Sequence, residues 1–135
     1  MTETQTSQPA GCPPPRIAVV DDDVSFVRSV GRLLRSAGYP VETFASGDDF
    51  LAALPAAAPE CLVVDVHMPQ MDGLELHDKL LAQGIAFPIV FMTAQETPQI
   101  LHHVQEAHSE LLLKPFDRQA LVHAIARAVP PSLHH

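Results

Sequence analysis

The run Cys61-Leu62-Val63-Val64-Asp65 decides the fold of this chain. Four apolar residues in succession end at an acid, and no polar residue alternates with them. Strands of a parallel sheet that is covered on both faces have this pattern, whereas a strand with one solvated face alternates apolar and polar residues. The run therefore predicts a buried parallel strand that places Asp65 at its carboxyl end.

Shorter apolar runs on both sides of this strand alternate with helical patterns. Gly38 and Gly84 are typical helix stops, and Pro98 suits the first turn of a helix. Ser46 and Asp117 are typical N-caps. Strands are therefore expected at residues 17–20, 41–44, 61–64, 88–92 and 111–113, and helices at 24–37, from Ser46 to about 54, 74–81, 98–107 and from Asp117 to about 128.

Five strands that alternate with five helices predict an α/β fold, in which right-handed crossovers build a doubly wound, open parallel sheet. The strands near residues 17, 62, 89 and 111 are continuously apolar, so we expect each of them to be covered on both faces. Ligands of such sheets bind outside the carboxyl ends of the strands. The polar residues that follow the strands are therefore the candidates for a functional site.

One domain is expected to span residues 16–129. Residues 1–15 contain four prolines and no apolar period, so they predict a disordered tail, and Pro130-Pro131 opens a C-terminal tail at residues 130–135. The chain has 135 residues, of which 47% are hydrophobic. That length and composition suit a single domain with a real core.

The chain is acidic, with 8 Lys and Arg against 16 Asp and Glu and a net charge of −8. This balance argues against nucleic-acid binding, which needs a basic face. No apolar run approaches the roughly 20 residues of a membrane span, and the polar start is not a signal peptide, so a cytoplasmic protein is expected. Cys12 and Cys61 look neither paired nor metal-bound, and Cys61 suits a small buried core position.

Acids, a hydroxyl and a lysine follow four of the five predicted strands. They are Asp21, Asp22 and Asp23 after the first strand, Asp65 after the third, Thr93 after the fourth and Lys114 after the fifth. Asp23 also suits the N-cap of the next helix. Clustered carboxylates repel one another unless a cation lies between them, and oxygen ligands suit Mg²⁺. A carboxylate can also attack phosphorus, and a lysine and a hydroxyl can neutralise the phosphoryl oxygens.

Four segments resemble the receiver domain of two-component response regulators, and in detail FixJ-type receivers. They are Val19-Val20-Asp21-Asp22, the stretch Val64-Asp65-Val66-His67-Met68-Pro69-Gln70-Met71-Asp72-Gly73-Leu74-Glu75-Leu76, Phe91-Met92-Thr93-Ala94, and Lys114-Pro115-Phe116-Asp117. The resemblance covers about residues 16–129. It implies a flavodoxin-like, five-stranded parallel sheet of strand order 2-1-3-4-5.

The resemblance also implies a role for each candidate site residue. Asp65 would be the phosphoacceptor, Thr93 would hydrogen-bond the phosphoryl group, and Lys114 would pair with it. The implied Mg²⁺ ligands are Asp22, Asp21 through water, Asp65 and the backbone carbonyl of His67. The Lys114–Pro115 peptide is implied to be cis.

By the same resemblance, the chain would take a phosphoryl group on Asp65 from a histidine kinase or a phosphotransfer protein. It would signal by protein–protein contact or phosphorelay, through the surface formed by the fourth helix, fifth strand and fifth helix. No independent substrate turnover is expected. A single-domain regulator is favoured, and a receiver excised from a DNA-binding transcription factor and a pseudo-receiver interaction module remain open. A stand-alone phosphatase or phosphotransferase is disfavoured, because His67 stands where a second acid would follow Asp65.

Two positions depart from the usual pattern of the family. Leu111 stands where receivers usually have Tyr or Phe, and it offers neither a ring to stack nor a hydroxyl group. His108-Ser109 stands where Gly-Ala is usual. The coupling between the site and the output surface is therefore expected to differ from the usual one.

The remaining histidines are interpreted as surface residues. His77 and His123 fit ordinary helix-surface positions, and His67 fits either a solvated loop or a group that steers water near the phosphoryl group. His102 and His103 are adjacent on one helix, so they do not face a common metal site. They are expected to contribute to a partner-binding face.

Overall fold

The computed structural model describes residues 14–54, 56 and 58–129. Apart from Pro14 and Pro15, the two predicted tails therefore lie outside the described residues. The strands are β1 (Ile17–Val20), β2 (Val41–Phe44), β3 (Cys61–Asp65), β4 (Ile89–Thr93) and β5 (Glu110–Leu113), and the helices are α1 (Val24–Ser36), α2 (Gly47–Ala53), α3 (Gly73–Ala82), α4 (Pro98–Glu106) and α5 (Arg118–Ala128).

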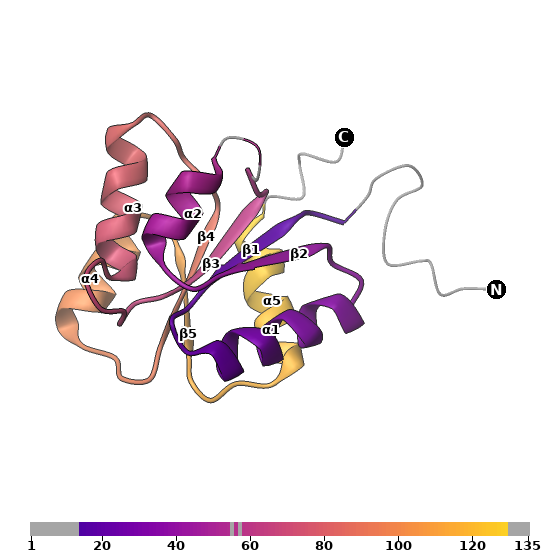
Figure 1. Cartoon of the computed structure of the whole chain (residues 1–135). Coiled ribbons are helices and arrows are strands. Elements are labelled where there is room, and N and C mark those ends of the chain that lie inside the picture. Colours follow the sequence, from indigo (N-terminus) through magenta and orange to yellow (C-terminus); the bar gives the residue numbers. More distant parts are fainter. Residues whose placement is uncertain (1–13, 55, 57, 130–135) are drawn as a thin grey trace.

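All five strands pair in parallel in one sheet of order β2-β1-β3-β4-β5. Helices α1 and α5 cover one face of the sheet, and α2, α3 and α4 cover the other (Figure 1). The predicted α/β class, the doubly wound arrangement and the strand order are confirmed. The predicted element boundaries agree with the observed ones to within one or two residues.

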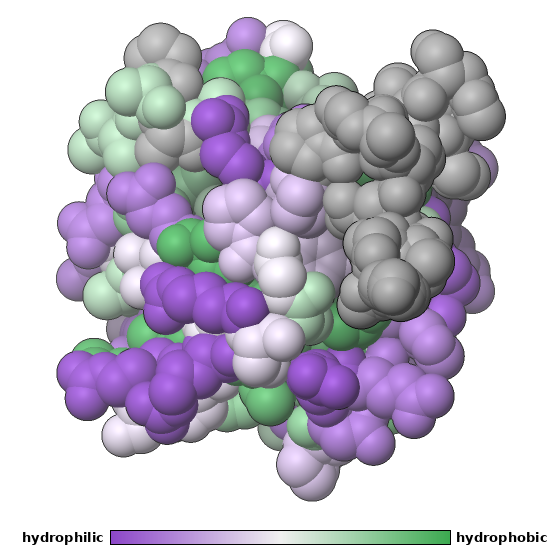
Figure 2. Space-filling view, turned by 90° about the vertical axis from the view of Figure 1, so that its right-hand side faces the viewer, coloured by the Kyte–Doolittle hydropathy of each residue, from purple (hydrophilic) through white to green (hydrophobic). Residues whose placement is uncertain are grey.

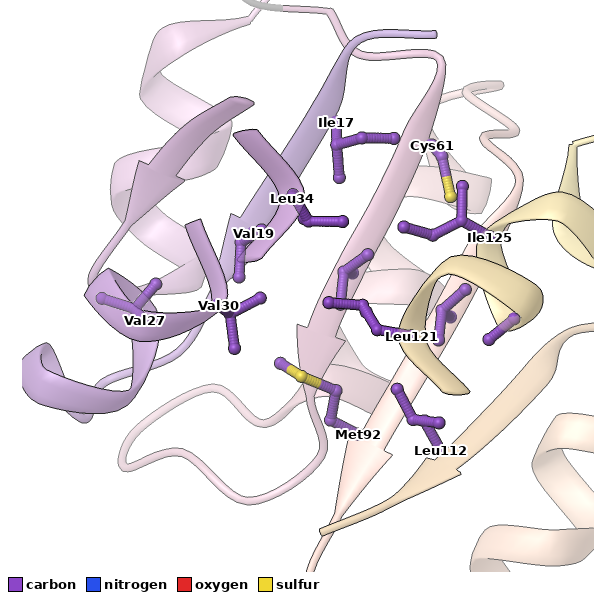
Figure 3. Packing of buried hydrophobic residues seen from close by; sticks show 13 residues of the cluster. Ile17, Val19, Val27, Val30, Leu34, Cys61, Met92, Leu112, Leu121 and Ile125 are labelled. Atoms are coloured by element: carbon purple, nitrogen blue, oxygen red, sulfur yellow. The ribbon is translucent and has the colours of Figure 1, made fainter. Parts of the chain in front are cut away.

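The two faces of the sheet bury two separate clusters of apolar side chains. Successive strand residues point to opposite faces, so Val63 and Met92 belong to the cluster under α1 and α5, whereas Val64 and Phe91 belong to the other cluster. Figure 3 shows the first cluster, with side chains of α1 and α5 packed against the strands. Cys61 lies in it, fully buried as predicted, and burial raises the pKa of its thiol to about 12.

The prediction for the last strand is wrong in one respect. β5 is an edge strand, and Leu113 leaves 46% of its surface exposed, whereas β1, β3 and β4 are buried along their whole length. The apolar run Leu111-Leu112-Leu113 resembles a central strand in sequence. Its exposure follows from its position at the end of the sheet, which the run itself does not encode.

Three helices end with the same backbone pattern. Gly38 after α1 and Gly84 after α3 have φ of 97° and 77°, and each donates its N–H to a carbonyl of the last helical turn. After α4 the same position is His108, with φ of 52°, and its N–H donates to the carbonyl of Gln105 at 3.2 Å. A side chain in this left-handed conformation is strained, whereas glycine is not.

We therefore expect His108→Gly to stabilise the fold by about 1 kcal/mol. The free energy of unfolding measured in urea checks this value. His123→Gly, at an exposed position inside α5, is the matched control and should destabilise by a similar amount, because glycine weakens a helix interior. A lower free energy of unfolding in His108→Gly would contradict this. It would show that the histidine side chain stabilises the fold by more than its left-handed backbone destabilises it.

His77 is not a surface residue, contrary to its interpretation from the sequence. Only 7% of its surface is exposed, because α3 turns it toward α4 and β4. Its Nδ1 lies 3.2 Å from Nε2 of His103, and both rings meet Phe91 edge to face with centroids 5.6 Å apart. The apolar spacing of α3 did not reveal this position, because histidine is read as polar in such patterns.

Burial, and then the neighbouring His103, lower the pKa of His77, while Asp78 raises it. The unfolded chain therefore takes up a proton at this residue near its ordinary pKa of about 6.5, whereas the folded chain holds the neutral form to lower pH. Stability is present above that pKa and is lost as the pH falls below it. His77→Phe should therefore lose less unfolding free energy than the wild type does between about pH 7 and pH 5. Equal pH dependence in His77→Phe and the wild type would contradict this.

Candidate functional site

The carboxyl edge of the sheet brings together acids that are far apart in the sequence. Val20 and Val64 are partners in the β1–β3 pairing, so the residues that follow them, Asp21 and Asp65, reach the same level of the edge. Asp21 is 1% exposed and Asp65 is 5% exposed. Asp22 lies beside them and faces solvent.

Lys114 reaches both buried acids. Its Nζ lies 3.0 Å from Oδ2 of Asp21 and 3.1 Å from Oδ1 of Asp65. The backbone positions it, because the N–H of Lys114 donates to the carbonyl of Thr93 at 2.8 Å. The predicted cis peptide between Lys114 and Pro115 is confirmed. The predicted association of acids and lysine from three strand ends is therefore present in the fold.

Phe26 is a member of this site that the sequence did not suggest. The Nζ of Lys114 lies 4.2 Å from the centre of its ring, and this ring meets Phe116 edge to face at 5.7 Å. A cation over an aromatic face is attracted by the ring quadrupole. In sequence Phe26 is merely one apolar residue in the first turn of α1, three residues after the N-cap Asp23. Phe26 acquires this role because the side chain of Lys114 places its ammonium over the ring.

The negative charge of the site exceeds what the lysine compensates. Burial raises the pKa of Asp65 and the charge of Asp21 raises it further, whereas the hydrogen bond and charge of Lys114 lower it, with a net increase. For Lys114, burial lowers the pKa, but hydrogen bonds and charges from Asp21 and Asp65 outweigh burial and raise it overall. Lys114 therefore keeps its proton. The net negative charge of the site favours the binding of an additional cation.

The three carboxylates have the chemistry and spacing of a cation site. One oxygen from each of Asp21, Asp22 and Asp65 lies within 4.8 Å of the others. Oxygen donors of this kind suit a hard divalent ion such as Mg²⁺, which needs only one or two carboxylates and keeps several waters. Both carboxylate oxygens of Asp21 are engaged, because Oδ2 accepts from the Lys114 ammonium and Oδ1 accepts the N–H of Asp23 at 2.9 Å. These bonds fix the orientation of this carboxylate at the start of α1.

Thr93 and His67 lie near the site, but they differ in burial and in hydrogen bonding. Thr93 ends β4 and is fully buried, and its hydroxyl donates to the carbonyl of Gln95 at 3.0 Å and accepts the N–H of Gln95 at 3.2 Å. His67 is exposed in the loop after β3. The implied roles of the Thr93 hydroxyl and the His67 carbonyl remain predictions.

The loop after β3 is held directly against the backbone of Asp65. The N–H of Gly73 donates to the carbonyl of Val66 at 2.9 Å. A Cβ at Gly73 would lie 2.5 Å from the carbonyl oxygen of Asp65, which no real contact allows. Asp72 and Glu75 cap α3 reciprocally at this point. The Asp72-Gly73 pair therefore fixes the distance between α3 and the end of β3.

The chain belongs to the family of response regulator receiver domains, whose family model matches residues 17–126. Receiver domains are signalling modules. Among the described residues, no helix combines the length and apolar character needed to cross a membrane.

Curated and solved relatives are consistent with this assignment. The chain is 38% identical over 114 residues to the transcriptional regulatory protein FixJ of Bradyrhizobium diazoefficiens, covering 84% of this chain and 56% of that protein. It is similar to the chemotaxis protein CheY4 of Vibrio cholerae, with a TM-score of 0.78, 30% identity and coverage of 85% and 98%. A structure of response regulator StyR gives a TM-score of 0.78 at 40% identity, with coverage of 91% and 61%. The chain spans about half the length of several curated relatives that it matches.

Proposed function

We propose that Asp65 accepts a phosphoryl group and that the resulting aspartyl phosphate is the signalling state of this receiver. The contact that carries the proposal is the 3.1 Å approach of the Lys114 ammonium to Asp65 beside two further carboxylates. A structural ion pair needs one acid, whereas Lys114 contacts two acids here and a third, Asp22, lies beside them. Such an excess of carboxylates at the functional edge of a doubly wound sheet is typical of a site that binds cationic and phosphoryl groups.

The proposed reaction transfers one phosphoryl group without net proton transfer at Asp65. A carboxylate oxygen of Asp65 forms a bond to phosphorus, and the bond from phosphorus to the donor's nitrogen or oxygen breaks. The bonding electrons leave with the donor group. Lys114 stays protonated and stabilises the phosphoryl oxygens. The Thr93 hydroxyl would exchange its bond to Gln95 for one to a phosphoryl oxygen.

A divalent cation fits the same edge. Asp21, Asp22, Asp65 and the backbone carbonyl of His67 would hold Mg²⁺, Asp21 through a water molecule. When bound, Mg²⁺ supplies positive charge that neutralises the phosphoryl oxygens during transfer. The charge count supports this part of the proposal, because three carboxylates lie together at this edge and Lys114 is the lysine that contacts two of them.

The proposed donor is a histidine kinase or a phosphotransfer protein, and the proposed output is a protein partner that contacts the α4-β5-α5 face. Exposed Leu113 at the free edge of β5 supports a contact there. Leu111 is partly buried and packs against the apolar cluster under α4. Its side chain has no aromatic ring or hydroxyl group that could move in response to a change at Thr93. We therefore expect the output to depend on movement of α4 rather than on rotation of a ring.

A second candidate is a receiver that acts on a DNA-binding output region. Its support is that FixJ, DctD and NtrC are named as transcriptional regulatory or DNA-binding proteins and match this chain over 56%, 25% and 24% of their lengths. The phosphoacceptor chemistry is the same for both candidates. They differ only in the partner of the α4-β5-α5 face.

Incubation with acetyl phosphate and Mg²⁺ tests the proposal. The intact mass should increase by one phosphoryl group, and the adduct should survive acid and be lost in base, as an acyl phosphate is. Removal of Mg²⁺ with a chelator should prevent the increase. If no adduct forms under conditions that label an active receiver, the phosphoacceptor proposal is wrong and the chain is a pseudo-receiver interaction module.

A further inference from the structure

The ammonium of Lys114 has a third neighbour besides the two buried carboxylates. Its Nζ lies 3.0 Å from Oδ2 of Asp21, 3.1 Å from Oδ1 of Asp65 and 4.2 Å from the centre of the Phe26 ring. An ammonium has three N–H donors and no acceptor, so it can serve two carboxylates and still turn a side toward an aromatic face. Phosphoryl transfer as described above uses the acids and the lysine but gives this ring no part.

The first turn of α1 fixes the ring relative to the acid that the lysine contacts. The N–H of Asp23 donates to Oδ1 of Asp21 at 2.9 Å, and Oδ1 of Asp23 accepts the N–H of Phe26 at 3.0 Å. The Phe26 ring lies against the Lys114 ammonium, which donates to Oδ2 of Asp21. These four residues therefore form a closed set of contacts, in which the N-cap of α1 sets the positions of the carboxylate and the ring together.

A second aromatic ring, that of Phe116, contacts Phe26 from another direction. The two rings meet edge to face, with centroids 5.7 Å apart and planes inclined by 82°. Aromatic pairs prefer such an arrangement. Both side chains are half-buried and pack against the apolar cluster under α1 and α5. The Phe26 ring is therefore held by its neighbours, independently of the lysine.

Phe26 lies at the end of α1 that adjoins the site, and the other end of the helix has a different surface. Arg32 and Arg35, in the later turns of α1, are exposed. The side of the molecule toward which α1 and β2 extend has strongly hydrophilic residues over its lower half (Figure 2). The combination of a half-buried ring with a bound cation therefore belongs to the first turn of α1, next to the acids.

We propose that Phe26 is a positioning residue for phosphoryl transfer, whose ring holds the Lys114 ammonium beside Asp65. This inference rests on the proposed function of Asp65 and deepens it. A lysine side chain is flexible, and 19% of the Lys114 side chain is exposed, so an unrestrained ammonium could turn toward solvent. The ring attracts the cation and so opposes that movement.

An aromatic face suits this task better than a further carboxylate would. It attracts a cation through its quadrupole and carries no formal charge, so the positive charge of Lys114 stays available to the phosphoryl oxygens. Positive groups that are already in place when charge develops contribute most to such a step, and small displacements of them are costly. Loss of the ring face should therefore slow phosphoryl transfer without preventing it.

Phe26→Leu and Phe26→Tyr separate the aromatic face from the apolar volume. Leucine keeps much of the volume and lacks the face, whereas tyrosine keeps the face. With acetyl phosphate and Mg²⁺, the initial rate of adduct formation, followed by intact mass, should be about fivefold lower in Phe26→Leu. The rate in Phe26→Tyr should be close to that of the wild type.

Phe44→Leu is the matched control. It makes the same replacement at another half-buried ring, which meets Phe50 edge to face in the apolar cluster on the other face of the sheet. This variant should label at the wild-type rate. Circular dichroism verifies the folding of all three variants.

The chemical shifts of the Lys114 Hε protons give a readout that does not depend on phosphorylation. Protons held over an aromatic face are shifted upfield by the ring current. In NMR spectra of the unphosphorylated protein, these protons should therefore lie upfield of ordinary lysine positions in the wild type and in Phe26→Tyr. In Phe26→Leu they should return to ordinary positions.

Four results would overturn the inference. They are labelling of Phe26→Leu at the wild-type rate, labelling of Phe26→Tyr as slow as that of Phe26→Leu, an equal loss of rate in Phe44→Leu, and ordinary Lys114 Hε shifts in the wild type. The last of these needs no variant. If the wild-type protein forms no adduct at all, the proposed function of Asp65 is wrong, and this inference fails with it.

Discussion

Asp65→Asn is expected to abolish phosphorylation by acetyl phosphate and, in the cation-depleted protein, to raise the thermal midpoint of unfolding. Labelling is lost because an amide oxygen does not attack phosphorus as a carboxylate does. Stability increases because the fold disfavours the charged form of Asp65: burial and Asp21 raise its pKa more than Lys114 lowers it. A group whose pKa is raised on folding costs stability when ionised at neutral pH.

Loss of labelling together with a gain in thermal stability identifies an acid that serves function. Replacement of an acid that serves the fold would lower the stability instead. Asp78→Asn, at an exposed position on α3, is the matched control and should change neither the labelling nor, appreciably, the midpoint. The checks are intact-mass spectrometry for the adduct and differential scanning calorimetry for the midpoint. Labelling of Asp65→Asn to the wild-type level would refute the phosphoacceptor role, and a lowered midpoint would refute the electrostatic account of the site.

Lys114→Met should have the largest effect on stability, a loss of about 3 kcal/mol without divalent cations. Methionine keeps most of the length of the side chain but removes the ammonium. The two buried carboxylates that Lys114 contacts at 3.0 and 3.1 Å would then face each other without a cation. The contact of the ammonium with Phe26 would be lost as well.

Mg²⁺ should restore a large part of that loss, because it brings positive charge to the same carboxylates. The free energy of unfolding in urea, with and without Mg²⁺, measures both effects. Lys79→Met, an exposed lysine on α3, serves as the control and should change little in either condition. If Lys114→Met is as stable as the wild type without Mg²⁺, then the buried acids do not depend on the lysine for compensation.

The sheet and the central acids could be predicted because local sequence determines them. A buried parallel strand must be apolar on both sides, so the runs at β1, β3 and β4 were unambiguous. Residues at the carboxyl ends of adjacent parallel strands must meet, so Asp21, Asp65 and Lys114 could be grouped before the structure was known. N-caps such as Asp23 and Asp117 follow from side-chain chemistry within one turn.

Features that depend on contacts between distant elements could not be predicted in this way. His77 is polar in any helical pattern, and its burial arises only because α4 packs over α3. Phe26 meets Lys114 only because the fold brings the first turn of α1 and the residue after β5 to the same site. Exposure of β5 depends on strand order. These are properties of tertiary packing, and the periodic pattern of a single element does not reveal them.

Identification of the phosphorylated residue distinguishes Asp65 from the two neighbouring acids. After reaction with acetyl phosphate and Mg²⁺, borohydride reduces an aspartyl phosphate to homoserine, and tandem mass spectrometry of the digested protein identifies the reduced position. The site described here predicts homoserine at Asp65, with Asp21 and Asp22 unmodified. Reduction at Asp21 or Asp22, or at no aspartate of a protein that carries the phosphoryl mass, would contradict it.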